Sequence, residues 1–262
     1  MLGALDGFNA GEVVHYSAMP DLEKWVLHRI ATLQQYIQDM TECYDFHGIY
    51  TELHQFCNSD LSAFYFEIRK DMLYCDLPDS IGRRACRTVM HELFNRLTAW
   101  LAPIICFTAE EAWQAYVGDP KNSVHLRRYD EVPKIWYSAE TDARWAIIRQ
   151  VRQVVMSALE KARNDGTIGA SLQAAPVVYV SADMQEALAG QDAASLFITS
   201  AATILTDAPP TTAFRLDTVP GVAVDFAVAP GGKCARCWKF MPEVTEHKNI
   251  CNRCEEVVAS LI

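Results

Sequence analysis

The chain has 262 residues and a formal net charge of −10, and half of its residues are hydrophobic. These values are typical of globular proteins and exclude the disordered and fibrous classes. No run approaches the roughly 20 consecutive apolar residues of a membrane span, and the N-terminus lacks the layout of a secretory signal, so we expect a cytoplasmic protein.

Long amphipathic helices are predicted in the first part of the chain, where apolar side chains recur every three or four residues. Pro103 fits the first turn of the fourth of these helices, and Gly48 marks a stop after the first. Helices joined by short turns form antiparallel bundles, so we expect a bundle over residues 1–165. The predicted helices cover residues 21–45, 50–68, 80–100, 103–118 and 138–163.

The pattern changes after residue 165. The β-branched run Val177–Val180 predicts a strand, and Pro and Thr/Asp turns separate further short elements. We expect a small α+β domain over residues 166–230, with Pro230-Gly231-Gly232 as a hinge into a separate C-terminal module, residues 231–262. The further predicted elements are a helix over 183–188 and strands at 204–205, 214–216 and 222–228.

Two Cys-x-x-Cys pairs, separated by thirteen residues, dominate this module: Cys234 with Cys237, and Cys251 with Cys254. Each pair can turn two sulfurs toward one point, and four thiolates suit one tetrahedral Zn²⁺ with no position open for water. A module of this size cannot bury a sufficient core, so the ion is expected to be structural. Redox cysteines and an iron–sulfur cluster are the alternatives. A thioredoxin-like redox pair would occur once, between a strand and a helix, and iron–sulfur clusters usually have other spacings.

Basic residues concentrate in two segments of this acidic chain. Residues 121–163 carry nine basic and five acidic side chains, and residues 231–262 carry five and four. Arg236 and Trp238 flank Cys237, and an aromatic ring beside guanidinium groups can stack an unpaired base and hold its phosphates. Alternatively, Trp238 packs beneath the ribbon as its core. The sequence leaves both possibilities open.

No catalytic residue is predicted. The sequence contains no His-Glu-x-x-His pair, no Gly-x-Ser-x-Gly elbow and no phosphate-binding glycine loop. Glu110 and Glu111 are adjacent and point to different sides of a helix, so we interpret them as surface charge rather than as an acid/base pair.

Several stretches together carry a family resemblance that extends over nearly the whole chain. They are residues 2–5 with Phe8, 19–27, 64–71, 101–104, 107–113, 123–126, 160–163 with 168–172, and Cys234-Ala235-Arg236-Cys237-Trp238. In this order they resemble the C-terminal portion of bacterial isoleucyl-tRNA synthetases, which are class I enzymes. The helical bundle is shared with related synthetases, and the terminal four-cysteine ribbon favours the isoleucyl family.

The resemblance implies a mainly α fold: an anticodon-binding bundle, a small α+β junction domain and a four-cysteine zinc ribbon. It implies that the chain binds the anticodon arm of isoleucine tRNA and supports ATP-dependent aminoacylation by a catalytic domain of the same parent chain. The family's His-Ile-Gly-His and Lys-Met-Ser-Lys-Ser signatures are absent, so we expect part of a longer ligase that is inactive alone. The resemblance also implies a monomer. The expected tRNA contacts are Arg236 and Trp238 first, then Lys239, Arg253, Arg83, Arg84, Arg87, Arg149 and Arg152.

One alternative belongs to another functional class. The acidic segments also fit a helical protein-interaction module whose zinc ribbon only stabilises the fold. Salt-sensitive binding to RNA separates the two, because phosphate contacts weaken steeply as salt is added.

Overall fold

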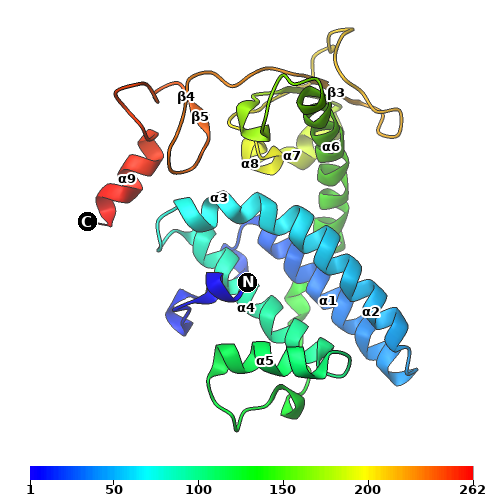
Figure 1. Cartoon of the computed structure of the whole chain (residues 1–262). Coiled ribbons are helices and arrows are strands. Elements are labelled where there is room, and N and C mark those ends of the chain that lie inside the picture. Colours follow the sequence, from blue (N-terminus) through cyan, green and yellow to red (C-terminus); the bar gives the residue numbers. More distant parts are fainter. Residues whose placement is uncertain (262) are drawn as a thin grey trace. The chain divides into compact units, whose positions relative to one another are not determined.

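The computed structural model describes residues 1–261, whose elements are drawn in Figure 1. The chain divides into two compact units. The first comprises Met1–Phe66 and Pro78–Thr141, and the second comprises Glu67–Leu77 and the chain from Asp142 onward. The sequence division at residues 165 and 230 stays a prediction. Within the described range, no helix combines the length and apolarity needed to cross a membrane.

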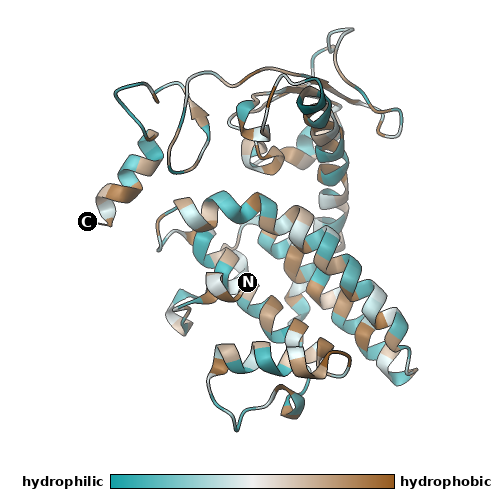
Figure 2. Ribbon diagram, in the orientation of Figure 1, coloured by the Kyte–Doolittle hydropathy of each residue, from teal (hydrophilic) through white to brown (hydrophobic). Residues whose placement is uncertain are grey.

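The first unit is built mainly of helices. Helix α1 packs against α2 and α4, and α4 packs against α5. Leu22, Val26 and Ile30 of α1 lie four residues apart and are at most 1% exposed, which confirms the predicted helical period. Figure 2 shows hydrophobic residues alternating with hydrophilic ones along these helices. The helices are α1 (Asp21–Glu42), α2 (Phe46–Gln55), α4 (Ile81–Leu101) and α5 (Cys106–Val117).

The second predicted helix is longer at both ends than the sequence indicated. Helical residues run from Phe46 through a π-wound segment, Phe56–Phe66, into α3 (Glu67–Cys75). The helix begins early because the side chain of Asp45 accepts a hydrogen bond from the backbone N–H of Gly48. Gly48 therefore lies in the first turn of α2, and its interpretation as a stop signal was wrong.

Pro103 lies in a turn and not in the fourth predicted helix. The backbone N–H groups of Ile104 and Ile105 both donate to the carbonyl oxygen of Leu101, which closes the end of α4. Helix α5 then runs from Cys106 to Val117, and Gly118, with a φ of 69°, provides a left-handed cap. Short 3-10 turns complete this unit at Leu2–Leu5, Ala10–Glu12, Tyr16–Ala18, Val124–Leu126 and Lys134–Trp136.

The second unit contains a small sheet with strand order β2-β1-β3, in which β1 pairs parallel with β2 and antiparallel with β3. The stripe predicted on the fifth helix is confirmed, since Trp145, Val151 and Leu159 of α6 are 0% exposed. The elements are α6 (Ala139–Asn164), a 3-10 turn (Ser171–Gln173), β1 (Val177–Val180), α7 (Ala182–Leu188), α8 (Ala193–Phe197), β2 (Thr203–Leu205) and β3 (Val222–Asp225).

The strand expected at residues 214–216 is reduced to a single bridge. Phe214 exchanges backbone hydrogen bonds with Val224, at 2.8 and 2.9 Å. The side chain of Arg215 instead donates to the carbonyl oxygens of Ala213 and Pro210, which holds the segment in a turn.

A two-stranded ribbon, β4 (Gly232–Lys233) and β5 (Phe240–Met241), leads to the C-terminal helix α9 (Asn252–Ser260). Gly231 has a φ of 91°, and a Cβ atom there would lie 2.1 Å from the carbonyl oxygen of Met241. The backbone N–H of Gly232 donates to the carbonyl oxygen of Val244. Close packing on the ribbon therefore requires glycine at position 231.

Candidate metal centre and nucleic-acid interface

The four predicted ligands converge at one buried point. The Sγ atoms of Cys234, Cys237, Cys251 and Cys254 all lie within 4.8 Å of one another, and those of Cys237 and Cys251 are 3.8 Å apart. A tetrahedron of sulfurs with metal bonds of about 2.3 Å has edges of about 3.8 Å. The sulfurs can therefore hold one metal ion, and because all four ligands are protein thiolates, the coordination shell has no place for water.

Each Cys-x-x-Cys pair forms a tight turn, or knuckle. Hydrogen bonds within the two knuckles favour an ionised sulfur at Cys234. Burial opposes ionisation, but N–H groups of Cys237, Cys251 and Arg236 donate to this sulfur and together lower its pKa to about 6. The donor from Cys251 lies 3.3 Å away. Burial raises the pKa of Cys237 and of Cys251. A bound cation would offset that cost, since it stabilises thiolates.

Cys75, at the end of α3, belongs to the small core of the ribbon, a role that was not predicted from the sequence. It is buried with the four ligands and Val244, and its Sγ lies 3.9 Å from the carbonyl oxygen of Arg236. Burial raises the pKa of Cys75 to about 11, so it stays a thiol at neutral pH. No local motif reveals this packing, because Cys75 stands 161 residues before Arg236.

Arg236 contacts the end of α3. Its guanidinium donates to the carbonyl oxygens of Cys75, at 2.6 Å, and Tyr74, at 3.3 Å. These are among the last carbonyls of the helix, where a cation also meets the negative end of the helix dipole. This predicted tRNA contact is therefore engaged within the protein.

Arg253 of α9 forms an ion pair with α3. It donates to both carboxylate oxygens of Asp71, each at 2.7 Å, and to Asp76 at 3.2 Å. The Nζ of Lys239 lies 3.7 Å from Asp71. Burial alone would raise the pKa of Asp71, but Arg253 and Lys239 outweigh burial and lower it. Two predicted tRNA contacts thus share one carboxylate.

Trp238 is 60% exposed, which contradicts the alternative that it forms the core of the ribbon. Its φ of 65° places it in the left-handed region, and its backbone N–H donates to the carbonyl oxygen of Cys234. The first cysteine knuckle therefore holds the indole out from the ribbon. The Nζ atom of Lys233 lies 5.4 Å from the ring centroid.

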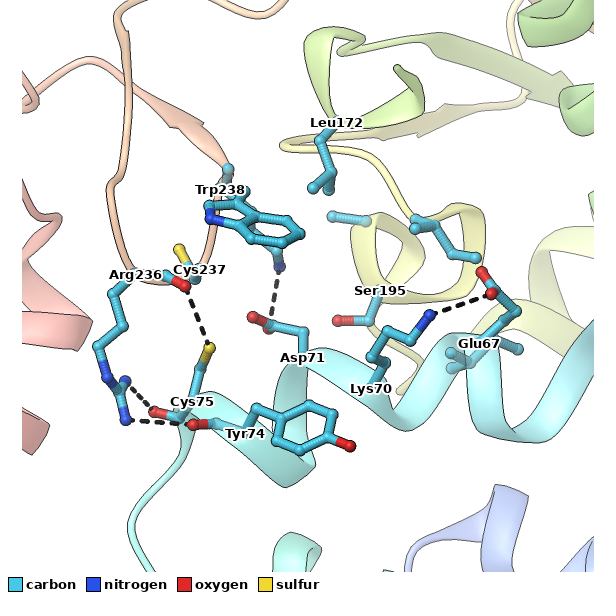
Figure 3. A pocket seen from close by; sticks show the side chains of 14 residues that line it. Glu67, Lys70, Asp71, Tyr74, Cys75, Leu172, Ser195, Arg236, Cys237 and Trp238 are labelled. Carbon is cyan, nitrogen blue, oxygen red and sulfur yellow. Dashed lines mark hydrogen bonds and ion pairs between the residues drawn. The ribbon is translucent and has the colours of Figure 1, made fainter. Parts of the chain in front are cut away.

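A cavity of about 490 Å³ lies beside this indole (Figure 3). Its wall combines Trp238 and Lys239 of the ribbon with Asp71 and Tyr74 of α3 and Ser195 of α8. Lys70, which was not identified from the sequence, also lines the cavity and has a side chain that is 65% exposed. Aromatic, cationic and hydroxyl groups thus meet around a space large enough for a nucleobase.

The predicted helix arginines lie on two different helices. Arg83, Arg84 and Arg87 are partly buried on α4 in the first unit, and Arg149 and Arg152 are partly buried on α6 in the second.

Three of these arginines donate hydrogen bonds to backbone carbonyls within the fold. Arg84 donates to the carbonyl oxygens of Gly11 and Glu12, and Arg87 donates to that of Asp6. Arg152 donates to the carbonyl oxygen of Leu196, and its pKa is lowered mainly by burial. Arg83 and Arg149 also have an interaction partner.

Comparison with known proteins accounts for this combination of helices and a cysteine ribbon. The family model described as the anticodon-binding domain of tRNA ligase matches residues 23–179. The chain belongs to this family. The match covers most of the helical sequence and confirms the resemblance stated above for the bundle.

Full-length relatives extend the similarity to the ribbon. The chain is 46% identical to isoleucine–tRNA ligases of Gluconobacter oxydans, Agrobacterium fabrum and Ruegeria pomeroyi, over 99%, 93% and 97% of its length. These alignments cover 26%, 25% and 27% of the relatives. The chain thus spans about a quarter of the length of these ligases.

Proposed function

We propose that the chain is the tRNA-binding part of an isoleucine–tRNA ligase and recognises the anticodon arm of isoleucine tRNA. Binding there would position the tRNA for ATP-dependent aminoacylation by a catalytic domain of the same parent chain. The contacts of these residues with tRNA would select the correct tRNA, and the residues would take no part in the chemical step. The parent protein is proposed to be cytoplasmic and to act as a monomer.

The observation that carries the proposal is the exposed indole of Trp238 beside the cavity of about 490 Å³. Stacking on an aromatic side chain is a usual way to bind an unpaired base of a tRNA loop. Lys70 on the same wall is 65% exposed and pairs with Glu67 at 3.3 Å, and its ammonium group could exchange this partner for a phosphate. Both the chemistry and the size of the cavity suit a single-stranded nucleotide.

We further propose that Zn²⁺ is the ion held by Cys234, Cys237, Cys251 and Cys254. The four-thiolate donor set and the 3.8 Å sulfur separation fit tetrahedral Zn²⁺. When bound, the ion would stabilise the knuckle that presents Trp238. Its role would be structural.

The proposed contacts differ in the support they have. Trp238 and Lys70 are exposed at the cavity, although Lys70 pairs with Glu67. Arg236, Lys239 and Arg253 make their contacts with α3 and are less available. Four arginines of α4 and α6 remain candidate phosphate contacts on the basis of charge alone: Arg83, Arg84, Arg149 and Arg152. The Arg87 guanidinium, predicted with them, donates to the carbonyl oxygen of Asp6 and pairs with Glu12, so we assign it a structural role.

A titration of labelled isoleucine tRNA with the metal-loaded chain tests the proposal, with an anticodon-altered transcript of the same tRNA as the control. Tighter binding to the unaltered tRNA, measured by fluorescence anisotropy near physiological salt, is the expected result. Equal binding to both transcripts would contradict anticodon recognition. Absence of binding to either would favour the protein-interaction alternative, for which the acidic first 60 residues supply the charge.

A further inference from the structure

The cavity beside Trp238 is formed by two segments that lie far apart in the sequence. Its α3 wall includes Asp71 and Tyr74, and its ribbon wall includes Trp238 and Lys239. A small shift of the ribbon along α3 would therefore change both the width of the cavity and the position of the indole. The contacts that hold the ribbon against α3 therefore also determine the shape of the cavity and the position of the indole.

The ion pair between Asp71 and Arg253 has the geometry for this task. Two parallel hydrogen bonds of 2.7 Å join the guanidinium to the carboxylate, and such paired bonds define orientation as well as distance. The side chains are 37% exposed for Arg253 and 26% exposed for Asp71. Arg253 lies in the first turn of α9, directly before the ligand Cys254. The pair thus connects the metal knuckle to α3.

The charge around Arg253 is unfavourable for a direct phosphate contact. Arg253 and Lys239 face Asp71 and Asp76, so the four formal charges cancel. A phosphate approaching Arg253 would compete with carboxylates that already accept three of its hydrogen bonds. A neutral, internally bonded cluster gives little attraction for a polyanion.

We propose that Asp71 and Arg253 form a latch that positions Trp238 for tRNA binding, and that Arg253 acts through this latch and not by contacting RNA. The proposal rests on the proposed function of the site and adds Asp71 to the residues that determine affinity. Arg253 and Asp71 are positioning residues, and Trp238 is the residue that contacts the base.

Arg253 as part of a latch and Arg253 as a direct phosphate contact make opposite predictions for Asp71→Asn. Removal of an acidic group from an RNA-binding surface strengthens binding if charge alone matters, and it also frees Arg253 for a phosphate. Loss of the latch weakens binding even though the surface becomes less negative. The matched control is Glu255→Gln, because Glu255 forms an ion pair with Lys248 inside the C-terminal module and not with α3.

The experiment measures binding of isoleucine tRNA by the whole metal-loaded chain and its Asp71→Asn, Arg253→Gln, Arg253→Lys and Glu255→Gln variants. We expect Asp71→Asn and Arg253→Gln each to weaken binding about tenfold, and the double variant to be no weaker than either single variant. Glu255→Gln should bind at least as tightly as the parent chain. The slope of log K against log salt should stay unchanged in all the latch variants, because no phosphate contact is lost.

Two outcomes distinguish an error in the latch proposal from an error in the proposed function. If the unaltered chain does not bind tRNA, the proposed function is wrong. If the unaltered chain binds and Asp71→Asn binds as tightly or more tightly, the latch is wrong. Metal content of one ion per chain verifies that each variant keeps its ribbon. Should Asp71→Asn lose metal, Arg253→Lys decides: the latch predicts weaker binding with an unchanged salt slope, and a phosphate contact predicts retained binding.

Discussion

The Nζ atom of Lys233 lies 5.4 Å from the centroid of the Trp238 ring, so a cation and an exposed indole project together from one cysteine knuckle. This arrangement explains how an aromatic residue of a metal ribbon can remain outside its core. The backbone of Trp238 is bonded to Cys234, while the side chain lines a cavity. The backbone hydrogen bond thus holds an exposed ring at the cavity wall, where we propose that a base stacks.

Trp238→Ala should weaken tRNA binding without loss of metal. A stacked base contributes about 1–3 kcal/mol, so the affinity is expected to fall about 5- to 150-fold. Trp238→Phe should retain part of the affinity, since it keeps an aromatic face. Anisotropy titrations give the affinity, and atomic absorption gives the metal content. Loss of metal from Trp238→Ala would assign the indole a structural role instead.

Backbone geometry at the same position gives an independent prediction. Trp238 has a φ of 65°, which only glycine adopts without strain. Trp238→Gly should therefore be more stable than Trp238→Ala by about 1 kcal/mol, although both lose the ring. Urea unfolding of the metal-loaded variants measures this difference. Equal stability would show that the knuckle relaxes when the indole is removed.

Local patterns in the sequence were sufficient to predict that helices dominate the first part of the chain and that the four cysteines come together, although they misplaced several helix ends. The period of α1 and the Cys-x-x-Cys spacing are properties of neighbouring residues, and both are confirmed in the structure. The partners of Arg253 were not predictable in this way. Asp71 precedes it by 182 positions, and only the packing of α9 near α3 brings them together. The positive charge of Arg253 indicated a contact with RNA, whereas in the fold its guanidinium binds the carboxylate of Asp71.

Metal removal should abolish the stacking surface and leave most helical structure intact. The ribbon's buried side chains are chiefly the cysteines themselves, so we expect it to unfold when a strong chelator removes the ion. The tRNA affinity should fall and return on addition of Zn²⁺, while far-UV circular dichroism changes little. Cys237→Ser should show the same loss. Cys43→Ser, at an exposed cysteine outside the cluster, is the control and should keep the metal.

Arg87→Ala should destabilise the first unit rather than reduce phosphate contacts. The Arg87 guanidinium donates to the carbonyl oxygen of Asp6 at 2.8 Å and pairs with Glu12 at 3.3 Å. Loss of such charged hydrogen bonds costs about 1–3 kcal/mol. Chemical unfolding should report this loss, and the salt slope of tRNA binding should not change. Arg128→Ala, at an exposed arginine of the same unit, should alter stability by less than about 0.5 kcal/mol.

Glu110 and Glu111, which the sequence presents as equivalent surface charges, should differ in their effect on stability. The Glu110 carboxylate accepts hydrogen bonds from the backbone N–H of Val124, at 2.8 Å, and from the hydroxyl of Ser123, at 2.9 Å. Burial would raise the pKa of Glu110, but these bonds outweigh burial and lower it below its usual 4.5. Glu111 is exposed. Glu110→Gln should therefore lower the Tm at pH 7, and Glu111→Gln should not.

The direction of the pH dependence follows from the lowered pKa of Glu110. A carboxylate whose pKa is lower in the folded state stabilises the fold above the unfolded pKa, and this contribution disappears as pH falls through the folded pKa. The Tm difference between Glu110→Gln and Glu111→Gln should thus be largest at neutral pH and shrink below pH 4.5. Thermal unfolding across this range measures it. A difference that is constant with pH would mean that the carboxylate charge of Glu110 does not hold the Val124 turn.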